Sequence, residues 1–185
     1  ESFDLTETKD SAKKIQEKTR DLLVSAVQNL IPKENQKQKF GILFSGGVDS
    51  SLIALICKEL GANFTCYTAA LEEPGMSAAP DLICAQEVAK ELGVELKVRK
   101  ISVDEVEKYV KIIPKLIEDN TVVKVGVGLT IYVALELAKK DGIKYVFTGL
   151  GAEELFAGYE RHALTGDVNK ECLAGLGTMY ERDLR

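Results

Sequence analysis

The chain has 185 residues, of which 45% are hydrophobic and 29% are charged, and its net charge is −5 at pH 7. These values are typical of one globular domain with a full core, and the negative charge gives no general attraction to nucleic acid. Residues 1–20 are polar and charged, and no apolar run approaches the roughly 18 residues that span a membrane. We therefore expect a cytoplasmic protein without membrane contacts.

Apolar residues recur at helical spacing over residues 12–31, which predicts a long amphipathic helix that ends at Pro32. A polar linker follows at 33–39. The sequence therefore predicts a single domain over residues 1–185, in which 1–39 form the N-terminal helix and linker and 40–185 form the core.

Strands and helices alternate through the core. Apolar runs predict strands at 40–44, 63–69, 94–101 and 143–148. Helical patterns cover the ranges 48–60, 77–92, 102–113, 125–140 and 167–184, with a capping box at the start of the third and a break at Pro114. Such alternation predicts an α/β fold, with a doubly wound, Rossmann-like parallel sheet that is covered by helices on both faces. Ligands of this fold bind beyond the carboxyl ends of the strands.

Residues 44–51 read Phe-Ser-Gly-Gly-Val-Asp-Ser-Ser, between the first predicted strand and the next helix. Adjacent glycines let the backbone approach a ligand closely, and the N-terminus of a helix favours a phosphate. Ser45 and Ser50 add hydroxyl groups, and Asp49 adds a carboxylate that can hold Mg²⁺. The pattern predicts a phosphate site, whereas the glycines and the aspartate alone would indicate only a tight turn that caps a helix.

A second glycine-rich turn, Thr148-Gly149-Leu150-Gly151, follows the fourth predicted strand. The carboxyl ends of parallel strands lie at one edge of a sheet. We therefore expect the two turns to converge and form one site.

The first turn resembles the PP-loop of ATP pyrophosphatases, Ser-Gly-Gly-x-Asp-Ser, which cut ATP between the α and β phosphates. Residues 148–159, Thr-Gly-Leu-Gly-Ala-Glu-Glu-Leu-Phe-Ala-Gly-Tyr, resemble the segment Ser-Gly-Glu-Gly-Ala-Asp-Glu-Leu-Phe-Gly-Gly-Tyr of asparagine synthetases. The synthetase domain of that family carries both turns in the same order. The resemblance runs from about residue 20 to the end and implies the adenine nucleotide alpha hydrolase-like variant of the Rossmann-like fold.

The resemblance implies ATP and Mg²⁺ as cofactors. Asp49 and Glu153 would hold the metal ion, and Glu154 would organise the pyrophosphate side of the site, so these three acids are the expected catalytic residues. The implied nucleotide-binding residues are Leu43, Ser45, Gly46, Gly47, Val48, Asp49, Ser50, Tyr67, Thr68, Thr148 and Gly149. Within this set, Leu43 would pack near the adenine, and the backbone of Tyr67 and Thr68 would hydrogen-bond it.

The family reaction is AMP-forming amide synthesis, which would make the chain an ATP-dependent carbon–nitrogen ligase of asparagine biosynthesis. A small carboxylate substrate is adenylated with release of pyrophosphate, and an amine or ammonia captures the acyl-adenylate. Glu1 is not the N-terminal cysteine that a glutaminase domain needs. Ammonia would therefore be free or would come from a glutaminase domain or subunit, and homodimerisation through the N-terminal helix stays open.

Three positions depart from the family segment: Leu150 replaces Glu, Glu153 replaces Asp and Ala157 replaces Gly. These changes favour a different acceptor substrate, or a non-catalytic nucleotide-binding module of a larger complex. A tRNA-modifying PP-loop enzyme is a further alternative, against which the negative charge and the lack of a CxxC pair count.

The remaining reactive side chains receive structural interpretations. Cys57, Cys66 and Cys84 lie in helix and strand patterns and are expected to be small buried side chains. The sole histidine, His162, is expected on the surface at the edge of the cleft.

Overall fold

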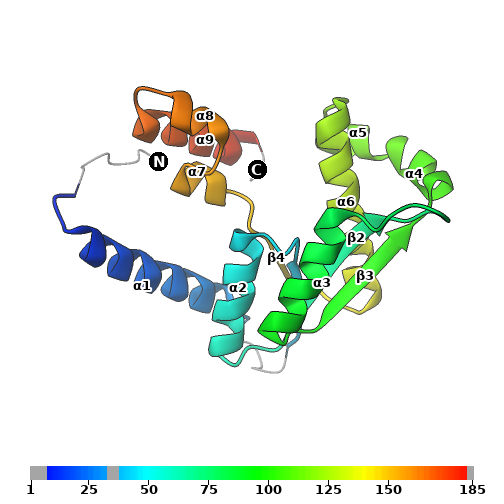
Figure 1. Ribbon diagram of the computed structural model, residues 1–185, viewed down its shortest axis with the longest axis horizontal. Coiled ribbons are helices and arrows are strands. Elements are labelled where there is room, and N and C mark those ends of the chain that lie inside the picture. The colour runs from blue at the N-terminus through cyan, green and yellow to red at the C-terminus, as the bar shows by residue number, and fades with distance from the viewer. Residues whose placement is uncertain (1–7, 33–37, 183–185) are drawn as a thin grey trace. The chain divides into compact units, whose positions relative to one another are not determined.

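The computed structural model describes residues 8–32 and 38–182 (Figure 1). The chain divides into two compact units, one of Val24–Thr148 and one of Glu1–Leu23 with Gly149–Arg185. The single domain that the sequence suggests stays a prediction, and most of the predicted linker at 33–39 lies outside the described residues. No helix in the described part of the chain has both the length and the apolar composition needed to cross a membrane.

Among the described residues of the first unit, four parallel strands form the sheet: β1 (Phe40–Leu43), β2 (Phe64–Leu71), β3 (Leu96–Ile101) and β4 (Val146–Phe147). They lie in the order β3-β2-β1-β4. Ile42 in the central strand is fully buried and pairs with Cys66 of β2 and with Phe147 of β4. The parallel sheet confirms the predicted α/β fold.

Helices cover both faces of this sheet. α2 (Val48–Glu59) and α3 (Pro80–Leu92) connect the first three strands on one face, whereas α6 (Val122–Lys140) packs on the other (Figure 1). Tyr67 of β2 lies in the core against Ala134 and Ala138 of α6. These small residues let the helix approach the sheet closely, which confirms the doubly wound arrangement.

The segment between β3 and α6 begins with the predicted capping box. Ser102 Oγ accepts a hydrogen bond from Glu105 N at 3.3 Å, and Glu105 Oε2 accepts one from Ser102 N at 3.1 Å. This box starts α4 (Val103–Val110), and the expected break separates it from α5 (Ile113–Ile117).

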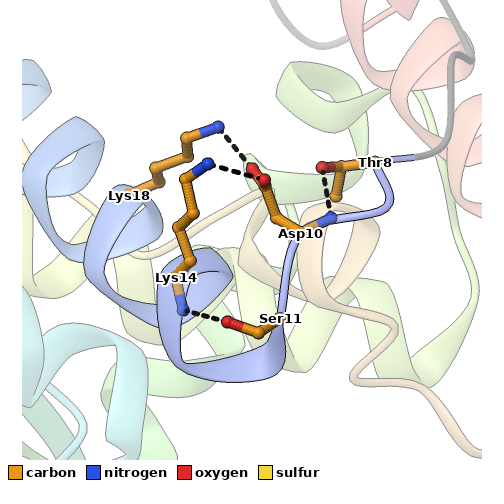
Figure 2. Close-up of polar contacts among 5 residues, drawn as sticks. All are labelled: Thr8, Asp10, Ser11, Lys14 and Lys18. Atoms are coloured by element: carbon orange, nitrogen blue, oxygen red, sulfur yellow. Dashed lines mark hydrogen bonds and ion pairs between the residues drawn. The ribbon is translucent and has the colours of Figure 1, made fainter.

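The predicted N-terminal helix is α1 (Ala12–Leu30), whose start is drawn in Figure 2. Ser11 Oγ accepts a hydrogen bond from Lys14 N at 3.4 Å. The Asp10 carboxylate accepts from Lys14 Nζ at 2.8 Å and from Lys18 Nζ at 2.6 Å (Figure 2). A carboxylate there offsets two lysine charges that the positive end of the helix dipole would disfavour.

Up to residue 182, where the described part of the chain ends, three helices follow the second turn: α7 (Ala152–Phe156), α8 (Glu160–Leu164) and α9 (Val168–Arg182). α9 confirms the predicted last helix and is capped by Asp167, whose Oδ1 accepts from Lys170 N at 3.0 Å. α7 and α8 were not predicted, because five residues are too few to display a helical period.

Candidate nucleotide-binding site

Both glycine-rich turns start at the same edge of the sheet. β1 ends at Leu43 and its neighbour β4 at Phe147, and these strands lie where the strand order reverses. Such a switch point is the usual ligand site of a doubly wound sheet. Thr148 therefore lies at the expected edge, while residues from Gly149 onward belong to the other unit, so convergence of the two turns stays a prediction.

Hydrogen bonds among its own residues shape the first turn. Ser45 N donates to Ser50 Oγ at 3.3 Å, Ser50 Oγ donates to the Gly47 carbonyl at 3.2 Å, and Gly47 N donates to Ser45 Oγ at 3.2 Å. The Ser50 side chain is buried, whereas Ser45 is exposed. Ser50 thus supports the loop from inside, and the hydroxyl of the exposed Ser45 is held within the loop by Gly47 N and by Ser50 Oγ, which lies 3.3 Å from it.

The two glycines of the loop differ in their surroundings. Gly46 has φ +78°, and a Cβ there would lie 2.8 Å from the backbone of Ala85 in α3. Gly47 has φ −68°, and a Cβ there would meet only Ser45 Oγ, at 3.2 Å. The fold therefore requires glycine at position 46, whereas at position 47 a Cβ would press only on the hydroxyl of Ser45.

Gly47 lies at the N-terminus of α2. Gly47 is the cap residue and supplies no side-chain cap, and the first helical hydrogen bond runs from Ser51 N to Gly47 O at 3.0 Å. The N–H groups of residues 48–50 precede that bond and have no acceptor within the helix. Asp49 is half-buried in this first turn, and Val48 is 78% exposed. The arrangement fits an anion that approaches with a metal ion.

The sequence did not predict that α3 supports the loop. Cys84, expected to be buried, is exposed, and its Sγ donates to the Gly46 carbonyl at 3.7 Å. That prediction was wrong because position 84 of α3 lies beside the loop and not over the sheet. Cys57 and Cys66 are buried as predicted, and burial raises the pKa of their thiols to about 11 and about 12.

The strand register describes the surroundings of the predicted adenine contacts. The Tyr67 carbonyl accepts from Phe44 N at 2.9 Å, and Thr68 pairs with Val98 of β3. Backbone groups of successive residues in a strand face opposite neighbours. The carbonyl of Ala69 and the backbone of Leu71 therefore face the β1 side, beyond the point where β1 ends. Leu43, half-buried, is the last residue of β1.

The second turn leads into α7 through a left-handed glycine, Gly151, with φ +94°. Glu153 and Glu154 lie half-buried in the first turn of this helix. Ala157 ends it with φ +56°, a conformation that disfavours residues with a Cβ. This geometry explains why glycine suits position 157.

Each acid of α7 packs against a glycine from elsewhere in the same unit. A Cβ on Gly158 would lie 3.0 Å from Glu153 Cγ, and a Cβ on Gly175 would lie 2.9 Å from Glu154 Cγ. Both acidic side chains therefore occupy space that larger residues would fill.

His162, expected on the surface, is 1% exposed. Its Nδ1 accepts from Tyr159 N at 3.4 Å, and its buried Nε2 has no partner among the described residues. The guanidinium of Arg161 lies 4.0 Å from the centre of the Tyr159 ring. The surface prediction failed because α8 turns this side chain inward.

A parallel α/β sheet with a Ser-Gly-Gly-x-Asp-Ser loop at its switch point defines the PP-loop class of nucleotide-binding proteins. The family model for asparagine synthase matches residues 18–174, and the chain belongs to this family.

Curated relatives agree with this assignment. The chain is 38% identical over 175 residues to a putative glutamine-hydrolyzing asparagine synthetase of Methanocaldococcus jannaschii, covering 91% of this chain and 31% of that protein. It is 32% identical over 129 residues to asparagine synthetase B of Escherichia coli, covering 65% of this chain and 23% of that protein. The chain thus spans about a third or less of the length of these relatives.

Solved structures give weaker similarities. The ammonia-dependent NAD synthetase of Campylobacter jejuni aligns with a TM-score of 0.47 and 23% identity, over 81% of this chain and 61% of that one. A U34-tRNA thiolase of Methanococcus maripaludis aligns with a TM-score of 0.48 and 17% identity, over 90% of this chain and 56% of that one. The family assignment rests on the sequence matches.

Proposed function

We propose that this chain is the ATP-binding part of an AMP-forming carbon–nitrogen ligase that adenylates a small carboxylate. One observation carries the proposal: Gly47 places no side chain at the N-terminus of α2, which lacks a side-chain cap and lies at the switch point of the sheet. A triphosphate needs such a place, because backbone N–H groups can approach its oxygens only where no side chain intervenes.

In the proposed reaction, a carboxylate oxygen of the acceptor attacks the α phosphorus of ATP. The bond between the α phosphorus and the bridging oxygen breaks, and pyrophosphate leaves with the electron pair. Ammonia or an amine then attacks the acyl carbon, and AMP leaves. Placement and charge neutralisation account for most of the rate gain in such a transfer, so no protein base is required for the first step.

Loop residues and α7 acids divide the work of binding. The N–H groups of Gly46 and Val48 and the Ser45 hydroxyl would hold the β and γ phosphates, while Gly47 N donates to Ser45 Oγ and Ser50 keeps the loop in shape. Asp49 and Glu153 would hold Mg²⁺, which would neutralise the phosphate charge. The described residues include no cluster of three metal-binding side chains, so phosphate oxygens and water would complete the coordination. This assignment requires the two units to bring Asp49 and Glu153 together.

The adenine would lie beside the end of β1. Leu43 offers an apolar contact there, and Thr148 and Gly149 would line the adenosine and the α phosphate. The backbone of Ala69 and Leu71 adds hydrogen-bonding groups on the open side of β2, next to the predicted Tyr67 and Thr68.

The acceptor side differs from that of the family segment. Leu150 stands where the family segment has Glu, and this apolar side chain is 65% exposed. Glu153 is one methylene longer than the family Asp, which would move its carboxylate relative to the ion. We infer that the acceptor carboxylate need not be aspartate. An assay of AMP formation with a panel of small carboxylates would identify it.

Calorimetry with Mg·ATP and pyrophosphate exchange test the proposal. Asp49→Asn should weaken Mg·ATP binding at least about tenfold, since it removes a charged ligand of the nucleotide-bound ion. Asp81→Asn, an equal charge change at an exposed position of α3, is the control and should bind as the wild type does. Equal binding by all three proteins would reject the site.

A second assay separates catalysis from binding. The wild type is incubated with ATP, ammonia and a panel of small carboxylates, and AMP is measured. AMP formation with one acceptor supports the ligase. ATP binding without AMP formation would favour a non-catalytic module, and salt-sensitive binding of bulk tRNA would favour an RNA-modifying enzyme.

A further inference from the structure

Gly175 lies in the interior of α9, opposite the side chain of Glu154. A Cβ at this glycine would lie 2.9 Å from Glu154 Cγ, 3.7 Å from Glu154 Cβ and 4.0 Å from Arg161 Nη2. Gly177, two residues later in the same helix, has no atom of the described residues within 4 Å of the corresponding position. The two glycines are therefore alike in helix position and unlike in surroundings.

The backbone gives no reason for glycine at position 175. Gly175 does not have a positive φ, so its backbone conformation is open to any residue. Glycine is the least favourable residue in a helix after proline. The space beside it, however, is filled by the stem of an acidic side chain. A side chain at position 175 would compete for that space.

We propose that Gly175 is a positioning residue for Glu154. Because position 175 of α9 has no side chain, the stem of Glu154 can pack against the helix there, and this packing sets the direction of the carboxylate. The inference rests on the proposed function, in which Glu154 organises the pyrophosphate side of the site. The helix after the motif therefore sets the orientation of an acid within it.

The contact between position 175 and Glu154 Cγ predicts which group would move if Gly175 were replaced by alanine. Glu154 Cγ lies beyond a rotatable bond, so an alanine at position 175 would turn the glutamate about χ1 and leave both helices in place. Tyr159 reports such a turn. Burial raises the pKa of the Tyr159 hydroxyl, and the charges of Glu154 and Glu153 and a hydrogen bond with Glu154 raise it further.

The test compares Gly175→Ala with Gly177→Ala in the full chain. Gly177→Ala should melt at or above the wild-type temperature, because alanine favours the helix, whereas in Gly175→Ala the cost of turning Glu154 opposes the same helix preference. Gly175→Ala should lower pyrophosphate exchange about tenfold and lower the pKa of Tyr159, followed by NMR with ¹³C-labelled tyrosine and assigned with Tyr159→Phe. Gly177→Ala should change neither reading.

A third variant guards against misfolding of Gly175→Ala. Glu154→Gln keeps the size of the side chain and removes its charge, so it should lower the Tyr159 pKa and slow exchange without any steric conflict. Wild-type exchange in Glu154→Gln would overturn the inference, as would identical readings from the two glycine variants. A Tyr159 shift in Gly175→Ala, together with a wild type that neither binds ATP nor exchanges pyrophosphate, would support the contact and reject the proposed function.

Discussion

Gly46 of the first glycine-rich turn lies against Ala85 of α3 so closely that a Cβ on the glycine would be 2.8 Å from the Ala85 Cα. Ala85 is fully buried, and its neighbour Cys84 donates its thiol to the Gly46 carbonyl. The loop is therefore supported by α3 as well as by α2, which it precedes in sequence. This support separates the roles of the two loop glycines.

The first prediction concerns Gly46→Ala and Gly47→Ala. Gly46→Ala should lower the free energy of unfolding by about 2 kcal/mol or more, because it adds both a clash and an unfavourable φ. Gly47→Ala should cost less, about 1 kcal/mol, because alanine is a poorer N-cap and its Cβ would press only on the Ser45 hydroxyl, and it should still weaken Mg·ATP binding. Urea unfolding and calorimetry measure both effects. Equal stability losses in the two variants would contradict the distinction.

The second prediction concerns thiol reactivity. Cys84 should react first with Ellman's reagent in the native protein, and Mg·ATP should slow this reaction, because the thiol lies beside the loop. Cys57 should react at least about 100-fold more slowly than an exposed thiol, since its pKa is raised from 9.0 to about 11 and it is buried.

Mass spectrometry identifies which thiol has reacted, and Cys84→Ser is the control that should abolish the fast phase. A fast phase that persists in Cys84→Ser would show that another thiol reacts first. A fast phase that Mg·ATP leaves unchanged would count against the placement of the nucleotide beside the loop.

The third prediction concerns acid sensitivity. Lys97 Nζ donates to Asp141 at 2.7 Å and Tyr67 Oη donates at 2.8 Å, and these hydrogen bonds hold the pKa of Asp141 below its ordinary value of 3.8. A carboxyl whose pKa is depressed by folding stabilises the protein above its unfolded pKa, and this contribution is lost as the pH falls through the folded pKa. At pH values above 3.8, Asp141→Asn should therefore unfold at a lower urea concentration than the wild type. As the pH falls below 3.8, the difference between the two urea midpoints should shrink.

Urea midpoints measured over a series of pH values check this prediction, with Asp104→Asn on the exposed face of α4 as the control. A difference between wild type and Asp141→Asn that stays constant with pH would show that the carboxylate charge does not stabilise the fold.

The fourth prediction concerns the end of α7. Ala157 has φ +56°, so Ala157→Gly should relieve backbone strain and raise the free energy of unfolding by about 1 kcal/mol. Ala174→Gly, at an exposed position inside α9, should lower it by about the same amount. Thermal melts of both variants measure the two changes. Destabilisation by Ala157→Gly would indicate that the alanine methyl group makes a packing contact that outweighs the strain.

The sheet and the first turn could be predicted from the sequence because their signals are local. Apolar runs gave the four strands, and Ser45 to Ser50 stood in register after the first of them. β4 is shorter than expected, since only Val146 and Phe147 pair with β1 while the exposed Tyr145 supplies a carbonyl to Gly41 N. The alternation of apolar residues does not reveal where the partner strand ends.

Several features of the candidate site depend on contacts between distant segments, which a pattern in one segment cannot show. The packing of Gly46 on Ala85, the room beside Gly175 and the inward turn of His162 all belong to this kind. A signal for the first did exist, since a small residue recurs at positions 85 and 89 of α3. The joining of Asp49 with Glu153 stays a prediction, because these residues lie in separate units.

β2 continues beyond the end of β1, which leaves peptide groups of Ala69 and Leu71 at an unpaired step of the sheet. Peptide groups are the same whatever side chain they carry. A base read through them would be distinguished by its own pattern of donors and acceptors, and substitutions at these two positions would leave that reading largely intact. Base selectivity would then depend on the backbone of the fold, and relatives with other side chains at these two positions would keep it.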